Sequence, residues 1–194
     1  ISFNGVSTKS GSLDKVLQRN IPLIMYWHGT DVLKALEYKE NGQLYSPYIQ
    51  KAVHFTDAPW LLEKMKPIVP NIGLLPFKTL SAITPNQDFE KLQVLTYVPQ
   101  GKETFYGLPW LLEWAKENPS VPVVVMGSDG KDWSTSENVE YTGWISTEKA
   151  EELYRNSPIY VRLTQQDGNA FSVTQALAQG ATVLWTRPHE RAVP

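Results

Sequence analysis

The sequence predicts an α/β fold built on parallel sheets, and three observations lead to it. Short apolar runs rich in β-branched residues recur along the chain, separated by helix-compatible stretches or polar loops. In residues 159–185, an apolar strand, a polar loop, a segment with apolar residues at helical spacing and a second apolar strand follow one another. Two strands joined by so short a helix run parallel through a right-handed crossover. Gly180 stands where that helix is expected to end.

The first half of the chain has the pattern of part of an α/β domain. Strands are predicted at 22–27, 52–56 and 71–77, and helices at 12–19, 32–39 and 57–65. Asp57 is expected to cap the third helix, with Pro59 in its first turn. His54 falls inside a strand and is therefore interpreted as structural.

The second half has the pattern of a Rossmann-like domain. Strands are predicted at 92–98, 121–126, 138–142, 159–163 and 181–185, and helices at 107–117, 147–156 and from Phe171 onwards. Ser146 or Thr147 is expected to cap the middle helix.

Two domains are expected, at 1–80 and 81–194. The polar stretch 78–88, which contains Pro85 and Asn86, is the predicted linker between them. The chain begins at Ile1 within an apolar run, and a short tail follows its last strand. We therefore expect two incomplete α/β halves.

Composition excludes several classes of function. The net charge of -2 gives no bulk attraction to nucleic acid, and the absence of cysteine excludes disulfides and thiol catalysis. Metal is not expected, because the chain has three scattered histidines and no Asp-x-Asp sequence. Walker, Gly-x-Gly-x-x-Gly and Gly-x-Ser-x-Gly motifs are also absent.

One stretch of the sequence carries a family resemblance. Asp167-Gly168 is followed eight residues after the aspartate by Gln175, in the sequence Gln-Ala-Leu-Ala-Gln-Gly. This pattern resembles the donor-site segment of GT-B glycosyltransferases, in particular the retaining family 4 type, which has two acidic residues at this spacing. The resemblance covers most of 94–185 and, more weakly, 22–77. It implies a GT-B-like fold, with a Rossmann-type C-terminal domain and the C-terminal part of a Rossmann-like N-terminal domain.

The resemblance implies a set of donor-binding residues. Lys102, in the loop after the strand at 92–98, corresponds to one of two basic residues that contact the donor diphosphate; a solvated loop lysine is the alternative. Gln175 takes the place of the glutamate that binds the ribose hydroxyls, and offers one carbonyl oxygen in place of a carboxylate. The base is expected near Gly143 and Trp144, although Trp144 has packing as an alternative. Backbone amides at the predicted helix N-terminus add phosphate donors, at Gly168, Asn169, Ala170 and Phe171.

Two further residues are candidates for catalysis. His28 follows the strand 22–27, where the resembled family has a His-Gly pair facing its cleft; a structural histidine is the alternative. Asp167 matches the first acid of the family pattern, near the transferred sugar, whereas an aspartate before glycine is also a common turn residue.

The function expected from these residues is transfer of a sugar from a nucleotide-sugar donor to an unknown glycan, lipid or small-molecule acceptor. No cofactor is expected, and an oligomer or partner chain that completes the fold is possible. A cytoplasmic location is expected, with peripheral membrane association as an option. Two alternatives stay open: a non-catalytic module that binds a nucleotide sugar or a partner, and a nucleotide-sugar epimerase of GT-B fold.

Overall fold

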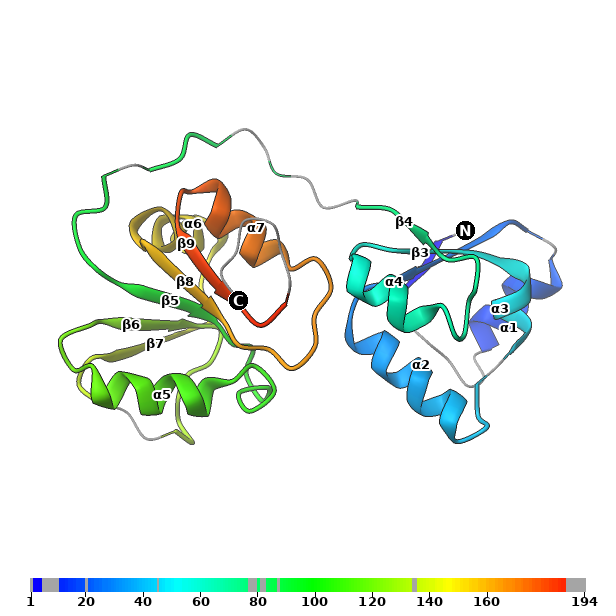
Figure 1. The fold of residues 1–194 in the computed structure, drawn as a ribbon, viewed down its shortest axis with the longest axis horizontal. Helices are drawn as coiled ribbons and strands as arrows, with labels where there is room; N and C mark the ends of the chain where they lie inside the picture. The colour runs from blue at the N-terminus through cyan, green and yellow to red at the C-terminus, as the bar shows by residue number, and fades with distance from the viewer. Residues whose placement is uncertain are drawn as a thin grey trace. The chain divides into compact units, whose positions relative to one another are not determined.

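The computed structural model describes residues 2–4, 11–19, 21–44, 46–76, 80, 83–86, 88–133 and 136–187 (Figure 1). The chain divides into two compact units. The first comprises Ile1–Lys78 together with the short segment Gln166–Asn169, and the second comprises Thr79–Gln165 and Ala170–Pro194. Each unit has its own sheet.

The first unit is a parallel sheet with strand order β1-β2-β3-β4 in its described residues. Its strands are β1 (Ser2–Asn4), β2 (Leu23–Trp27), β3 (Ala52–Thr56) and β4 (Gly73–Leu74). Its helices are α1 (Gly11–Gln18), α2 (Thr30–Glu40), α3 (Ser46–Lys51) and α4 (Pro59–Met65). Since the strands are parallel, the loops after β2 and β3 lie at the same edge of the sheet.

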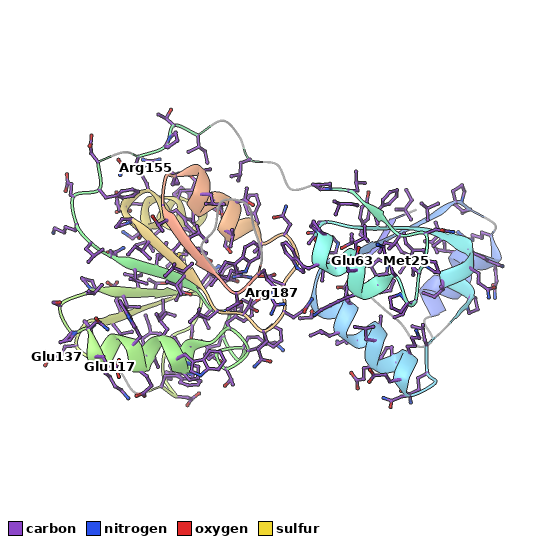
Figure 2. The ribbon with its side chains drawn as sticks, in the orientation of Figure 1. Met25, Glu63, Glu117, Glu137, Arg155 and Arg187 are labelled. Carbon is purple, nitrogen blue, oxygen red and sulfur yellow. The ribbon has the colours of Figure 1, made fainter. Side chains whose placement is uncertain are left out.

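The core of the first unit is organised by β2. Leu23, Met25 and Trp27 alternate along the strand and are buried, and the Met25 side chain is labelled in Figure 2. The Trp27 indole N–H donates to Nδ1 of His54 at 3.1 Å, and Nε2 of His54 lies 3.2 Å from the Ile49 carbonyl oxygen. His54 is therefore structural, as the sequence indicated.

Two elements of the first unit differ from the sequence prediction. Residues 46–51 form α3, where no helix was predicted. Of the strand predicted at 71–77, the described residues 71–76 contain only the two-residue β4, and residue 77 lies outside the described residues. Pro76 explains part of the second difference, because proline has no N–H to donate to a ladder.

The second unit is a doubly wound parallel sheet, with strand order β7-β6-β5-β8-β9 in its described residues. Its strands are β5 (Val94–Tyr97), β6 (Val123–Met126), β7 (Val139–Gly143), β8 (Ile159–Arg162) and β9 (Thr182–Trp185). Its helices are α5 (Leu108–Glu117), α6 (Thr147–Asn156) and α7 (Phe171–Ala178). The chain builds outward from β5 to β7 and then returns to add β8 and β9 on the other side. The order therefore reverses between β5 and β8.

Local sequence explains these elements well. All four residues of β6 are buried, as expected for the interior of a parallel sheet. The Ser146 hydroxyl accepts from the Lys149 N–H at 3.3 Å, which confirms the predicted cap of α6. None of the described helices is both long enough and apolar enough to span a membrane.

Candidate functional site

The reversal of strand order marks one place in the second unit. In open parallel sheets, ligands bind beyond the carboxyl ends of the strands, where the order of the strands reverses. The loops that meet there are residues 98–107 after β5 and 163–170 after β8. The first contains Lys102 and the second leads into α7, so two segments predicted to bind a donor lie at this edge.

Three features attach the loop after β5 to the end of β8 and the loop that follows it. The Gln165 N–H donates to the Phe105 carbonyl oxygen at 3.0 Å. The guanidinium of Arg162, a buried residue, lies 4.9 Å from the centre of the Tyr106 ring, within cation–π range. Gly107 adopts a left-handed φ of 72°, and a Cβ there would lie 2.5 Å from Cβ of Leu163. The two segments are thus held by close packing as well as by a hydrogen bond.

Buried Glu103 connects the same loop to the next strand end. One carboxylate oxygen, Oε1, accepts from the Gly101 N–H at 3.0 Å and from the Ser128 hydroxyl at 2.9 Å. The Ser128 carbonyl oxygen accepts from the Gly143 N–H at 3.0 Å, which extends the network to the end of β7. Lys102 and Gly143 are therefore positioned by one set of polar contacts.

The pKa of Glu103 reflects this network. Desolvation by burial raises the pKa, but hydrogen bonds from its own N–H, from the Gly101 N–H and from the Ser128 hydroxyl outweigh it, so the pKa lies below its ordinary value. Because the pKa is lower in the folded state than in the unfolded state, ionised Glu103 stabilises the fold at pH values above its ordinary pKa. This stabilisation is lost as the pH falls through the folded-state pKa.

Lowering the pH is therefore expected to remove the contribution of Glu103 to the free energy of unfolding. Glu103→Gln, which cannot ionise, should be less stable than the parent at pH 7, and the difference should narrow as the pH falls below the ordinary value of 4.5. Urea unfolding of both proteins between pH 7 and pH 3 measures this. A constant difference across that range would contradict the prediction.

The other predicted donor residues of the second unit lie at the end of β7, directly after it, and at the start of and within α7. Gly143 ends β7 with a left-handed φ of 60°, and Trp144 is 88% exposed, so Trp144 does not pack in the core of the described chain. Ala170 is the N-cap of α7 and makes no side-chain cap, and Phe171 is 43% exposed at the start of that helix. Gln175 lines a cleft of the second unit with residues of α6.

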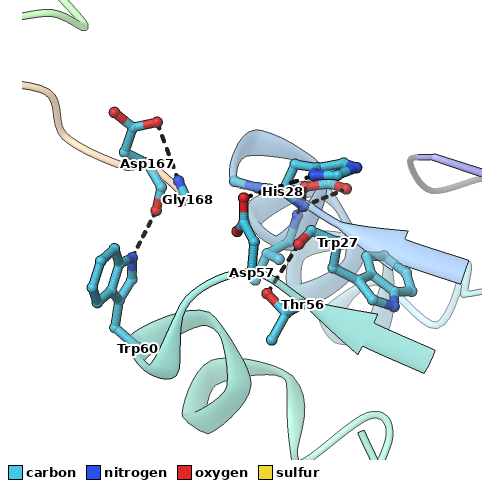
Figure 3. Close-up of polar contacts among 10 residues, drawn as sticks. Trp27, His28, Thr56, Asp57, Trp60, Asp167 and Gly168 are labelled. Carbon is cyan, nitrogen blue, oxygen red and sulfur yellow. Dashed lines mark hydrogen bonds and ion pairs between the residues drawn. The ribbon is translucent and has the colours of Figure 1, made fainter. Parts of the chain in front are cut away.

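His28 lies at a strand end in the first unit. It follows β2, and Asp57 follows the neighbouring β3, so adjacent parallel strands deliver both side chains to one edge (Figure 3). Nδ1 of His28 lies 3.9 Å from Oδ2 of Asp57, whose side chain is fully buried. Asp31 fixes the histidine backbone, since its Oδ1 accepts from the N–H groups of His28 at 3.0 Å and Gly29 at 2.7 Å.

The expected role of Asp57 as a helix cap is wrong. The N-cap of α4 is Ala58, and no side chain caps this helix. The carboxylate is directed to His28 instead, because the chain leaves β3 at the edge where β2 also ends.

Asp167 and Gly168 belong to the segment that groups with the first unit. The Trp60 indole N–H donates to the Asp167 carbonyl oxygen at 2.8 Å, and Oδ1 of Asp167 accepts from the Gly168 N–H at 3.1 Å (Figure 3). A Cβ at Gly168 would lie 2.7 Å from Oδ1 of Asp57 and would also meet the His28 carbonyl oxygen. Only glycine therefore fits at this position.

Sequence reasoning missed Glu103, Asp57 and Arg162. The signal for Arg162 was a basic residue in a predicted buried strand, and the signal for Glu103 was an acid next to the candidate phosphate-binding lysine. Among the described residues, no group of three or more His, Cys, Asp and Glu side chains is arranged to hold a metal ion.

Part of the chain matches a known family model. Residues 103–192 match the family model described as glycosyl transferase-like. A search of curated proteins by sequence gives no match.

Solved structures match over nearly the whole chain. Sucrose-phosphate synthase from Thermosynechococcus elongatus matches with a TM-score of 0.69 and 16% identity, covering 95% of this chain and 55% of that one. The pneumococcal O-GlcNAc transferase GtfA, in complex with UDP and GlcNAc, matches with a TM-score of 0.64 and 16% identity, covering 95% and 41%. WaaG, a glycosyltransferase involved in lipopolysaccharide biosynthesis, matches with a TM-score of 0.61 and 10% identity, covering 93% and 66%. At these identities the similarity establishes the fold, and this chain spans only part of each structure.

Proposed function

The chain has the fold of GT-B glycosyltransferases, with residues 103–192 matching the glycosyl transferase-like family, and from this we propose that it takes part in transferring a sugar from a nucleotide-sugar donor. One observation supports this most: the loop that carries Lys102 is attached to the loop after β8 at the strand-order reversal of the second unit. A nucleotide diphosphate bound at this edge needs a cation and backbone amides. Lys102 and the start of α7 supply these groups.

Lys102 is the proposed diphosphate ligand. Its backbone N–H donates to the Pro99 carbonyl oxygen at 3.0 Å, while its side chain is exposed in a loop whose next residue, Glu103, is anchored. An anchored loop with an exposed ammonium group loses little conformational entropy when it binds an anion.

Lys102→Ala is expected to weaken binding of a nucleotide diphosphate by about 1.5–3 kcal/mol, the scale of a charge-assisted hydrogen bond. Folding stability should stay nearly unchanged, because the side chain is exposed. Calorimetric titration with UDP, GDP and ADP measures the first effect and thermal unfolding the second. Lys116→Ala is the matched control, since this lysine pairs with Glu113 on α5. Equal affinity of parent and Lys102→Ala for every nucleotide that binds the parent would reject this role.

His28 and Asp167 are proposed to act near the transferred sugar. The observation that supports this for His28 is its fixed backbone beside a buried carboxylate at the edge of the first sheet. For Asp167, the hydrogen bond from Trp60 to its carbonyl oxygen holds the backbone and leaves the half-buried carboxylate to accept from Gly168. The proposed acceptor is a glycan, a lipid or a small molecule.

A non-catalytic donor-binding module is the second candidate, because Gln175 replaces an acid of the family pattern. The two functions differ in one measurement. Titration with a panel of nucleotide sugars, followed by an assay for donor hydrolysis, would give binding with hydrolysis for the enzyme and binding alone for the module.

A further inference from the structure

A cleft in the second unit is lined both by Gln175 and by an acidic residue of another helix, Glu151. The cleft has a volume of about 680 Å³ and lies between α6, α7 and the described residues of the segment 80–84. From α6 it is lined by Thr147, Glu151, Tyr154 and Arg155, and from α7 by Phe171, Gln175 and the following Gln179.

Glu151 and Gln175 hold corresponding positions along the two helices that line the cleft. On each helix the lining residues are three or four positions apart or adjacent, so they lie on one face of the helix. Both helices begin at the edge where the parallel strands end, and they run back along the sheet in the same direction. Glu151 and Gln175 are each the second lining residue of their helix, about 6 Å along it from the first.

Asn86 fixes the far end of the cleft. Its N–H donates to the Gln179 carbonyl oxygen at 2.9 Å, and its side-chain amide donates to the Arg155 carbonyl oxygen at 3.0 Å. One residue thus joins the C-terminal ends of the two helices, and Figure 2 labels Arg155 at the end of α6. The near end of the cleft, at Thr147 and Phe171, adjoins the strand edge that carries the proposed donor site.

We propose that Glu151 supplies the carboxylate that binds the ribose hydroxyls of the nucleotide, across the cleft from Gln175. This inference rests on the proposed nucleotide-sugar function. A ribose diol offers two hydroxyl protons, which a carboxylate accepts with both oxygens, whereas a glutamine accepts through one oxygen and donates through its amide. Gln175 is then free to donate to a ribose oxygen while Glu151 accepts. In the resembled family this negative charge lies at the position of Gln175, on the helix that corresponds to α7. Here it lies on α6.

Continuity along the chain supports this position for the ribose. The loop expected to contact the base, Gly143 and Trp144, runs directly into α6, and Thr147 at the start of α6 lines the cleft. A base at this loop therefore places the attached ribose at the near end of the cleft. Glu151 is one helical turn further along.

Glu151→Gln tests the proposal on the whole chain. The ligand is whichever of UDP, GDP and ADP binds the parent best. We expect its dissociation constant to rise about fivefold to tenfold in the variant, which is the difference between a charged and a neutral hydrogen-bond acceptor. The 2′-deoxy form of that nucleotide should bind the parent more weakly than the ribonucleotide does. In Glu151→Gln the two forms should bind nearly equally. Glu152→Gln is the matched control, because Glu152 pairs with Lys149 and does not line the cleft.

An exchange of the two side chains sharpens the test. Gln175→Glu alone would place two carboxylates in one cleft, so it should bring no gain in affinity. The double variant Glu151→Gln with Gln175→Glu should bind within about twofold of the parent, because it again has one carboxylate and one amide.

The outcomes separate this proposal from the one on which it rests. If the parent binds the ribonucleotide and its 2′-deoxy form equally, or if Glu151→Gln binds both as the parent does, the role of Glu151 is overturned while donor binding stands. If the parent binds none of the three nucleotides, both proposals are overturned.

Discussion

Gly107→Ala is expected to lower the free energy of unfolding of the second unit by about 3 kcal/mol. A left-handed backbone costs a residue with a side chain about 1–2 kcal/mol, and Gly107 has a φ of 72°. The added Cβ would also lie 2.5 Å from Cβ of Leu163 and 2.6 Å from its carbonyl oxygen. Relieving such an overlap shifts backbone and costs about 1–3 kcal/mol more. Urea unfolding followed by circular dichroism measures the change.

Gly101→Ala is the matched control for that prediction. Gly101 lies in the same loop with a φ of 75°, but a Cβ there would meet nothing within 4 Å. Gly101→Ala should therefore lower the free energy of unfolding only by the cost of the left-handed backbone, about 1–2 kcal/mol. If both variants lost the same free energy of unfolding, Leu163 would not pack closely against Gly107. The attachment of the two loops would then have to be explained differently.

Trp27→Ala is expected to lower the free energy of unfolding of the first unit by about 3–5 kcal/mol, the range for truncating a large core side chain. Trp27 is fully buried at the end of β2, and its indole N–H donates to His54 at 3.1 Å. The alanine leaves a cavity and also removes the hydrogen bond to the buried His54 ring. Chemical unfolding with a far-ultraviolet signal is the measurement.

Trp110→Ala provides the comparison for Trp27→Ala. Trp110 is 65% exposed on α5, so its truncation should change stability by no more than about 0.5 kcal/mol. A loss below about 1 kcal/mol in Trp27→Ala would mean that the core of the first unit does not depend on β2 as the structure indicates.

Local patterns predicted most of the elements, because they act over a few neighbouring residues. The helix predicted at 147–156 is α6 with the same bounds, and its Ser146 cap is present. The strand predicted at 159–163 is β8, shorter by one residue. The family pattern at Asp167 and Gly180 also led to the GT-B fold, which the structural matches bear out.

Elements with weak local signals were predicted less well. The two-residue β4 owes its place to pairing with Phe55 and Thr56 of β3, and that pairing is not visible in its own sequence. Asp57 has the local appearance of a helix cap, yet the neighbouring strand places His28 beside it. In both cases a partner distant in sequence outweighed the local preference.

The sequence by itself determined which segments become strands and helices, and which residue types are available for a donor: Lys102, Gln175, and the Asp167-Gly168 pair. Periodicity and turn residues are enough for this, because they act within one element. Only the tertiary structure decided that β8 returns beside β5, which joins the Lys102 loop to the loop before α7. It also placed Glu151 and Gln175, from two different helices, in one cleft. Strand order and the packing of helices depend on burial between distant segments, and no local pattern encodes them.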